Sequence, residues 1–163
     1  MLSYIAPFSR FSLAGFIGSR THEVITAIKE AADLPALEIS IAKRQADTKG
    51  ALRVTASVGP LKNLSVKDSA EVWLAVSESG LSSSVSRGEN KGRELHHAAT
   101  LRILRKIGTA DPEKQPFSFS ESVGLSPKAI WNLDHLRLVV FVQEKKSRHV
   151  LGVASTSWRG SAG

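Results

Sequence analysis

The stretch that decides the fold runs from Arg87 to Gly108 and reads RGENKGRELHHAATLRILRKIG. It combines glycines with many basic residues and holds the only two adjacent histidines of the chain. Such a composition fits a phosphate-binding loop, a metal site, a nucleic-acid-binding helix, or two strands joined by a turn. These interpretations require different spacings, so the sequence itself separates them.

The apolar residues after the glycines alternate along the chain, which indicates a strand. Read as a strand, the face that starts at Leu95 is mostly apolar and the face that starts at Glu94 is mostly polar. Read as a helix, the same apolar residues scatter around the axis and form no stripe. Alanine, leucine and arginine favour a helix by intrinsic propensity, but the alternation is the stronger pattern. We therefore predict a strand, a turn and a second strand, with Gly88 and Gly92 at positive φ and Asn90 tolerating it.

The alternatives to this hairpin fail on their own requirements. Gly88 and Gly92 enclose only Glu-Asn-Lys, and Arg-Glu follows, so the spacing and residues of a Walker phosphate loop are missing. His96 and His97 would point to opposite faces of a strand and cannot share one metal ion, and the other histidines are dispersed. The sequence therefore predicts no metal site and no cofactor, with His97 half-buried and His96 in solvent.

The chain shows no catalytic motif. It contains no cysteine, which excludes a disulfide framework and a CxxC redox centre. It also lacks the G-x-S-x-G element of many serine hydrolases. Glu89 and Glu94 lie among arginine and lysine residues that would keep both carboxylates ionised, the opposite of an acid–base pair.

A hydrolase would need a serine and a histidine that meet in space. The serine-rich segment 76–86 suits a loop and an edge strand, and Asp134 and His135 have no nucleophile beside them in the sequence. A hydrolase built on this segment therefore requires His97 or His135 to contact a serine in the fold. Without such a contact, the residues predict a protein that is not an enzyme and has no catalytic residues.

The charge of the chain leaves open a role in binding anionic partners. The 163 residues carry a formal net charge of +7, with 42% hydrophobic residues, as expected for one globular domain. A nucleic-acid surface would gather cations on one face beside aromatic residues, but aromatic residues make up only 6% and none lies within the opening stretch. On a strand, Arg102 and Lys106 are expected on the solvent face. The other cations considered are Lys43, Arg44, Arg105, Lys145, Lys146 and Arg148.

The N-terminal third predicts one helix. In SRTHEVITAIKEAADLP, Val24, Ile25 and Ile28 have helical spacing, and Pro35 ends the segment, which places a helix at about residues 20–32. The residues before it lack the basic start and the cleavage site of a signal peptide, so none is expected. No apolar run approaches the ~20 residues of a membrane-spanning helix.

After this segment the apolar period changes to two, which predicts antiparallel strands. The alternating stretches are ALEISIAK (36–43), ALRVTASV (51–58), AEVWLAVSE (70–78), LRLVVFVQE (136–144) and HVLGVAS (149–155). We predict a mainly β fold, an immunoglobulin-like antiparallel β-sandwich preceded by the one helix. The expected core residues are Ile39, Ile41, Val54, Trp73, Leu74, Val76, Trp131, Val139 and Phe141.

The opening stretch also resembles the C-terminal part of a family of exported bacterial proteins called domain of unknown function 1223. The residues that carry the resemblance form the glycine-containing turn: Arg87, Gly88, Glu89, Asn90, Gly92 and Arg93. The turn leads into a strand with basic residues at its end, and FIGSRTHEVITAIKEA, AEVWLAVSE and VVFVQE…HVLGVAS add weaker similarity.

Full-length members of that family look like a thioredoxin-like domain with a CxxC, joined to a β-sandwich. The resemblance implies that residues 1–34 are the remnant of a thioredoxin-like domain, 35–158 the sandwich and 159–163 a tail, so that the chain is a truncated member. It implies a periplasmic or secreted location, although the chain as written, without a signal peptide, would stay in the cytoplasm. The expected function is a non-catalytic accessory or interaction domain with an unknown protein partner. The alternative is a basic module that binds nucleic acid or an anionic surface.

Overall fold

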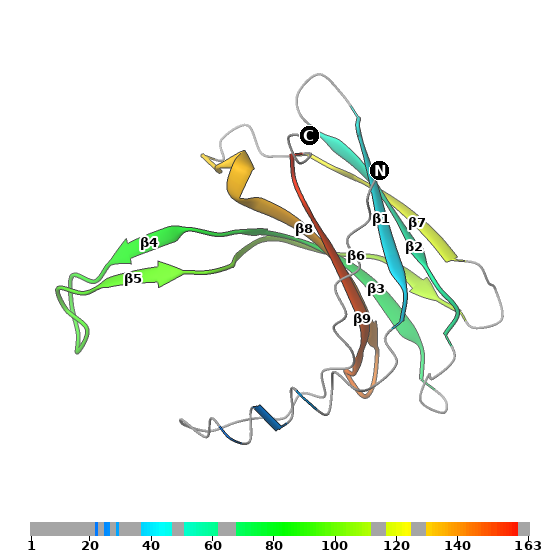
Figure 1. Cartoon of the computed structure of the whole chain (residues 1–163), viewed down its shortest axis with the longest axis horizontal. Coiled ribbons are helices and arrows are strands. Elements are labelled where there is room, and N and C mark those ends of the chain that lie inside the picture. Colours follow the sequence, from blue (N-terminus) through cyan, green and yellow to red (C-terminus); the bar gives the residue numbers. More distant parts are fainter. Residues whose placement is uncertain are drawn as a thin grey trace.

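The computed structural model of this protein describes residues 22, 25, 26, 29, 37–46, 51–61, 68–111, 117–124 and 130–159. In this part the chain is mainly β, and its strands are antiparallel (Figure 1). The strands are β1 (Ile39–Gln45), β2 (Leu52–Val58), β3 (Ala70–Glu78), β4 (Leu81–Ser84), β5 (Glu94–His97), β6 (Thr100–Ala110), β7 (Phe117–Val123), β8 (Leu136–Glu144) and β9 (Val150–Ser157). A short 3-10 helix, η1 (Leu133–His135), precedes β8.

The strands form two larger sheets and one small one. The first sheet has the order β1-β2-β7, the second has the order β6-β3-β8-β9, and β4 and β5 form a separate two-stranded sheet. Strands β3 and β8 lie in the middle of the second sheet, and every second residue of each strand is buried.

Buried residues of the two larger sheets form a single hydrophobic core. Val54 on β2, Leu74 on β3 and Val140 on β8 are completely buried within it. Trp158, directly after β9, is also buried in this cluster. Because alternate residues of each strand point to the core, the two sheets share apolar faces of period two.

The predicted core is partly correct. Three predicted core residues are half-buried and lie outside the core: Trp73, Val139 and Phe141. They alternate with the core residues of β3 and β8, so they belong to the opposite face of the sheet. Trp73 and Phe141 stack there with ring centroids 6.4 Å apart. The predicted core residues that the structure confirms as buried are Ile39, Val54, Leu74 and Val76, and those packed partly buried against the core are Ile41 and Trp131.

The strands predicted at 36–43, 51–58, 70–78, 136–144 and 149–155 correspond to β1, β2, β3, β8 and β9. Strand β7 was not predicted, although its sequence FSFSESV alternates phenylalanine with serine. Its partner is β2, and Phe117 lies opposite Val58. Its serine and glutamate residues are typical of loops, so the sequence alone does not indicate a strand. Only the pairing with β2 shows that the segment is part of a sheet.

The opening stretch is a hairpin followed by a strand, as the alternation predicts. β4 and β5 pair across the glycine turn, and β6 begins after a short break at Ala98 and Ala99. Two register shifts in the pairing of β6 with β3 leave Arg102 and Ile107 without an opposite residue. The shift between Val76 and Ser77 places Leu101 opposite Ser77, and Leu101 is 56% exposed. The mostly apolar face that starts at Leu95 is therefore not buried along its whole length.

The structure describes only part of the predicted N-terminal helix. His22, Ile25, Thr26 and Lys29 have helical backbone, and the Thr26 hydroxyl donates to the His22 carbonyl at 3.0 Å. The remaining residues of 20–32 lie outside the described part, so a helix over this range is not established. The rest of the predicted segment 1–34 and residues 160–163 of the predicted tail also lie outside it.

Gly152 on β9 is expected to be essential for the approach of β1 to β9. A Cβ at this position would lie 2.5 Å from the carbonyl oxygen of Leu37, whose N–H donates to the Leu151 carbonyl at 3.0 Å. Gly152→Ala should therefore destabilise the fold by about 1–3 kcal/mol in urea unfolding. In Gly124→Ala the nearest atom to the new methyl group is 3.9 Å away, on Ala51, so this control should stay within about 0.5 kcal/mol of wild type. Equal stability of the two variants would contradict the prediction.

Candidate functional site

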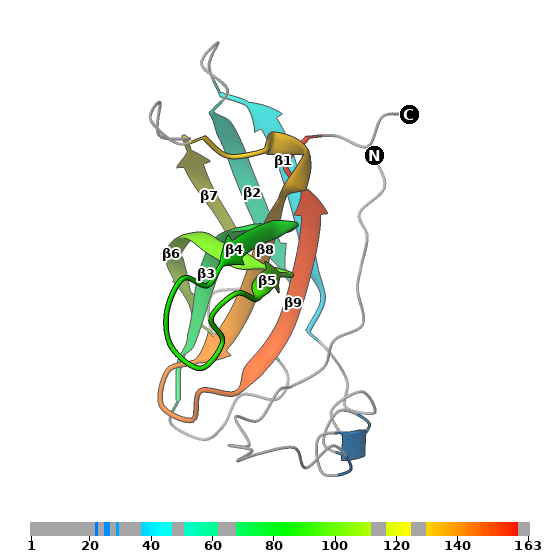
Figure 2. The same cartoon turned by 90° about the vertical axis from the view of Figure 1, so that its left-hand side faces the viewer.

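A β-hairpin projects from the body of the molecule, and we call residues 81–97 the arm (Figures 1 and 2). Glu78 lies opposite Thr100 in the second sheet, and Leu81 lies opposite His97 in the arm, so both pairs share one register. The arm is therefore the outer end of the long hairpin formed by β3 and β6. Its side chains are exposed or half-buried, and none is fully buried. Most of the surface of the arm is therefore open to solvent.

The tip of the arm contains the glycine turn. Gly88 and Gly92 both have φ of 83°, as predicted, and an added Cβ would meet no atom within 4 Å. The glycines therefore supply backbone conformation and not space. Val85 N donates to the Arg93 carbonyl at 2.9 Å and Gly92 N donates to the Val85 carbonyl at 2.8 Å, which closes the turn. Asn90 does not adopt positive φ. The turn contains all the motif residues predicted from the sequence, Arg87, Gly88, Glu89, Asn90, Gly92 and Arg93, and all are exposed.

One serine and one histidine meet on the arm. The Ser83 hydroxyl lies 3.0 Å from His97 Nε2, so the condition set for a serine hydrolase is met for His97. Acyl transfer also requires a group that orients the imidazole and donors that hold an oxyanion. Among the described residues, no carboxylate is bonded to the His97 ring, and the pair stands on an exposed two-stranded sheet. His96 is exposed and His97 half-buried, as predicted.

An ion pair between the half-buried Arg102 and the buried Glu78 fixes the root of the arm. Arg102 donates to Glu78 Oε2 from Nε at 2.8 Å and from Nη2 at 2.7 Å, and Asn132 N donates to Oε1 at 2.8 Å. The guanidinium also lies over the Trp131 ring, 5.6 Å from its centroid. Arg102 is the residue left unpaired by the bulge, which turns it toward Glu78. The prediction that it lies on the solvent face is therefore wrong.

This environment sets the ionisation of Glu78. Its side chain is 2% exposed, and burial raises its pKa, but the hydrogen bonds from Asn132 and Arg102 and the charge of Arg102 outweigh that effect. The pKa of Glu78 therefore lies below its ordinary value. The carboxylate stays charged beneath the arm and ties β3 to β6 and to the residues before η1.

A pocket of about 350 Å³ lies beside the root of the arm. Ser79 N donates to the His135 carbonyl at 3.2 Å, and Gly80, with φ of 71°, brings its backbone under the His135 ring. The carboxylate of Asp134 is paired with Arg159 at 2.9 Å. Arg137 is a further cation of the pocket wall, and one of its N–H groups donates to the Ser155 hydroxyl at 2.9 Å. The lining residues are Ser79, Gly80, Asp134, His135, Leu136, Arg137 and Ser157.

Three of the cations considered for a nucleic-acid surface, Lys43, Arg105 and Lys106, are engaged in contacts within the fold. Lys106 Nζ lies 2.7 Å from Glu71 Oε1. This hydrogen bond lowers the pKa of the buried Glu71 carboxyl, although burial acts to raise it. Arg105 pairs with Glu121 at 3.1 Å and links β6 to β7. Lys43 donates to backbone carbonyls at the end of β9, and burial lowers its pKa. Lys106 is 42% exposed, so it lies on the solvent face of β6 as predicted, and it bonds with Glu71 there.

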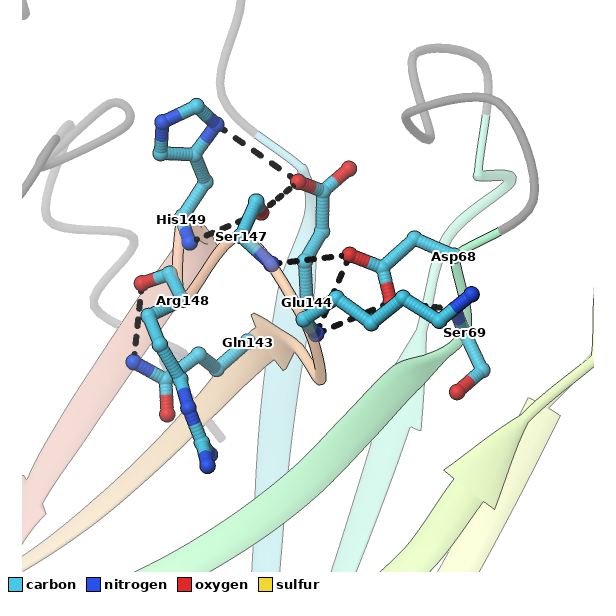
Figure 3. A network of polar contacts seen from close by, with 8 residues as sticks. Asp68, Ser69, Gln143, Glu144, Ser147, Arg148 and His149 are labelled. Atoms are coloured by element: carbon cyan, nitrogen blue, oxygen red, sulfur yellow. Dashed lines mark hydrogen bonds and ion pairs between the residues drawn. The ribbon is translucent and has the colours of Figure 1, made fainter.

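At the other end of the second sheet, the Asp68 carboxylate accepts hydrogen bonds from the turn between β8 and β9 (Figure 3). Its carboxylate accepts from Ser69 N at 2.8 Å, Lys146 N at 3.0 Å and Ser147 N at 3.0 Å. Burial raises the pKa of Asp68, but these backbone donors outweigh it, so its pKa is lowered. The basic residues after β8 thus lie in a turn, as predicted.

A second carboxylate supports the same turn (Figure 3). Glu144 is completely buried and accepts a hydrogen bond from the Ser147 hydroxyl, and His149 Nδ1 lies 3.5 Å from it. Gln143 donates to the Arg148 carbonyl at 2.9 Å, which holds Arg148 at φ of 64°. These contacts order the turn and leave the arm and its root as the candidate functional site.

The described residues contain neither a metal-binding cluster nor a membrane-spanning helix. No group of three or more His, Cys, Asp or Glu side chains in this part of the chain is arranged to hold a metal ion. No helix among the described residues is long and apolar enough to cross a membrane.

Comparison with known proteins identifies the family. Residues 12–143 match the family described as protein of unknown function, DUF1223. The chain belongs to this family. No curated protein matches the DUF1223 chain. It is similar to the crystal structure of a domain of the outer membrane lipoprotein Omp28 from Porphyromonas gingivalis, with 14% identity and a TM-score of 0.46 over 77% of this chain and 91% of that one.

The glycine turn that carries the DUF1223 resemblance identified the tip of the arm from the sequence. The ion pair of Glu78 and Arg102 at the root of the arm was not predicted. Glu78 follows Leu74 and Val76 in the core-facing phase of β3, and an acidic residue in that phase signals that a cation must reach it. Nothing in the sequence identifies Arg102, Trp131 or the residues of the pocket as its neighbours, because they come from separate segments.

Proposed function

We propose that this DUF1223 chain is a non-catalytic interaction domain whose arm contacts a protein partner. The observation that carries the proposal is that the arm is solvent-exposed along its length while its root is held by the ion pair of Glu78 and Arg102. An isolated two-stranded hairpin is marginally stable in water. The arm is fixed at its root, and none of its side chains is fully buried. It therefore suits a role in which a protein partner binds along it.

The proposal includes the finer architecture. Two antiparallel sheets with one shared core support an immunoglobulin-like β-sandwich at residues 35–158. Residues 1–34 are proposed to derive from a thioredoxin-like domain and 159–163 to form a tail, in a member of an exported family. In that setting the partner meets the arm in the periplasm or outside the cell.

The absence of catalysis is part of the same proposal. Ser83 and His97 are in contact, but a hydrolase would need further groups that the arm does not supply. A fluorophosphonate probe should therefore leave the chain unlabelled, and Ser83→Ala should behave as wild type with this probe. Stoichiometric labelling that is lost in Ser83→Ala would overturn this part of the proposal.

The interaction role can be tested by site-specific photo-cross-linking of the full chain expressed in a bacterial periplasm. We expect a photoreactive side chain at Asn90, on the tip of the arm, to give a discrete protein adduct. The same group at Ser57, an exposed residue of β2, should give none. No adduct from Asn90, or the same adduct from both positions, would contradict a specific role of the arm.

A further inference from the structure

The side of β4 that faces away from β5 is a free strand edge. Because β4 follows β3 in the chain, this edge lies in line with the place that β8 occupies beside β3. Leu136 at the start of β8 lies opposite Glu78, and the bond from Ser79 N to the His135 carbonyl extends this pairing by one residue. The chain before β8 is the η1 helix, which does not run along β4. In the described part of the chain, β4 therefore pairs with β5 alone.

This edge lacks the features that normally prevent strand addition. Edge strands are usually protected by lysine, proline, a bulge or a covering segment, but β4 has the sequence LSSS and no register shift. Val85 N points to Arg93, on the side of β5. Because backbone groups alternate along a strand, those of Ser82 and Ser84 point to the free edge.

The inner end of the free edge meets the pocket at the root of the arm. His135 and Arg137 line this pocket, and the charge of Asp134 is balanced by Arg159. The Ser79 hydroxyl adds a further donor, whereas the Ser157 hydroxyl donates to the Arg159 carbonyl. The pocket therefore offers a positive charge and hydrogen-bond donors at the point where an added strand would reach the body, a combination that suits a carboxylate.

The direction of the sheet selects which end of an added strand reaches this pocket. β8 is antiparallel to β3 and begins at the pocket. A strand placed antiparallel to β4 would run toward the body and end at Arg137, whereas a parallel strand would bring a terminal ammonium to the same arginine. The positive charge favours the first arrangement.

We propose that the β4 edge and the pocket bind the C-terminal segment of a partner protein as an added antiparallel strand. Main-chain hydrogen bonds to Ser82 and Ser84 hold the segment, and Arg137 and the neighbouring donors hold its free carboxylate. This inference rests on the proposed role of the arm as an interaction surface, and it specifies the partner as an extended peptide with a free C-terminus.

The test uses two random peptide libraries, one displayed with free C-termini and one with free N-termini, selected against the full chain. We expect enrichment from the first. A selected peptide should bind as the free acid and about tenfold or more weakly as the C-terminal amide, because a charge-assisted contact is lost. Arg137→Gln should weaken the acid by a similar factor and leave the amide unaffected. Arg53→Gln, an exposed arginine on β2, is the matched control.

A second variant tests the strand itself. Ser82→Pro removes an outward N–H while leaving the inward bonds to β5 in place, and should weaken both peptide forms about tenfold. Circular dichroism and the unfolding midpoint confirm that the variant is folded. Equal binding of acid and amide, enrichment from the N-terminal library alone, or no enrichment would overturn the inference. A protein adduct from the photoreactive group at Asn90, together with no peptide binding, would still support the arm as a protein-interaction surface. That result would overturn only the proposal that a C-terminal segment binds at the β4 edge.

Discussion

Replacing Arg102 with methionine is expected to lower the free energy of unfolding by about 3 kcal/mol, because it leaves a buried carboxylate without its cation. Glu78 is 2% exposed and receives two bonds from this guanidinium, at 2.7 and 2.8 Å. Methionine keeps much of the apolar contact with Trp131 but supplies no donor. Urea unfolding followed by tryptophan fluorescence measures the loss.

The matched control is the same substitution at Arg105, on the same strand. Its pair with Glu121 is 3.1 Å long, and the two side chains are 47% and 34% exposed. Arg105→Met should therefore cost at most about 1 kcal/mol. The double variant Glu78→Gln/Arg102→Met should recover at least about 1 kcal/mol relative to Arg102→Met, because the buried charge is removed with its partner. Equal losses at Arg102 and Arg105 would show that the root pair does not hold the arm.

Acid is expected to unfold the protein through three carboxylates whose pKa values are lowered in the fold. These are Asp68 in the β8–β9 turn, Glu71 beside Lys106, and Glu78 at the root of the arm. Between the folded and the ordinary pKa, the unfolded chain binds more protons than the folded one, so stability rises with pH. The stabilisation is complete above the ordinary carboxylate values, about 4, and is lost as pH falls through the lowered values.

Urea midpoints measured from neutral to acid pH should therefore fall steadily below about pH 5. The growing positive charge of the whole chain also destabilises it in acid, so the contribution of each carboxylate must be isolated by substitution. Glu78→Gln and Asp68→Asn should each reduce the loss between neutral and acid pH, while Ser57→Ala should match wild type. If both acid-to-amide variants lose stability with the wild-type slope, these carboxylates are not responsible.

The sequence determined the elements that local pattern encodes. Alternation along 70–78 and 136–144 located the central strands β3 and β8, since a strand buried on one face repeats its chemistry every second residue. Gly88 and Gly92 located the turn of the arm, because positive φ is a property of single residues. The same turn carried the family resemblance that the match over residues 12–143 confirms.

Only the tertiary structure decided how these elements combine into a candidate site. The bulge at Arg102 depends on the pairing of β6 with β3, and it reverses the face on which Arg102 was expected. Glu78, Asn132 and Trp131 are brought to it from segments far apart in the sequence. Periodicity describes one strand at a time, whereas a buried charge, a free edge and a pocket are fixed by which strands become neighbours.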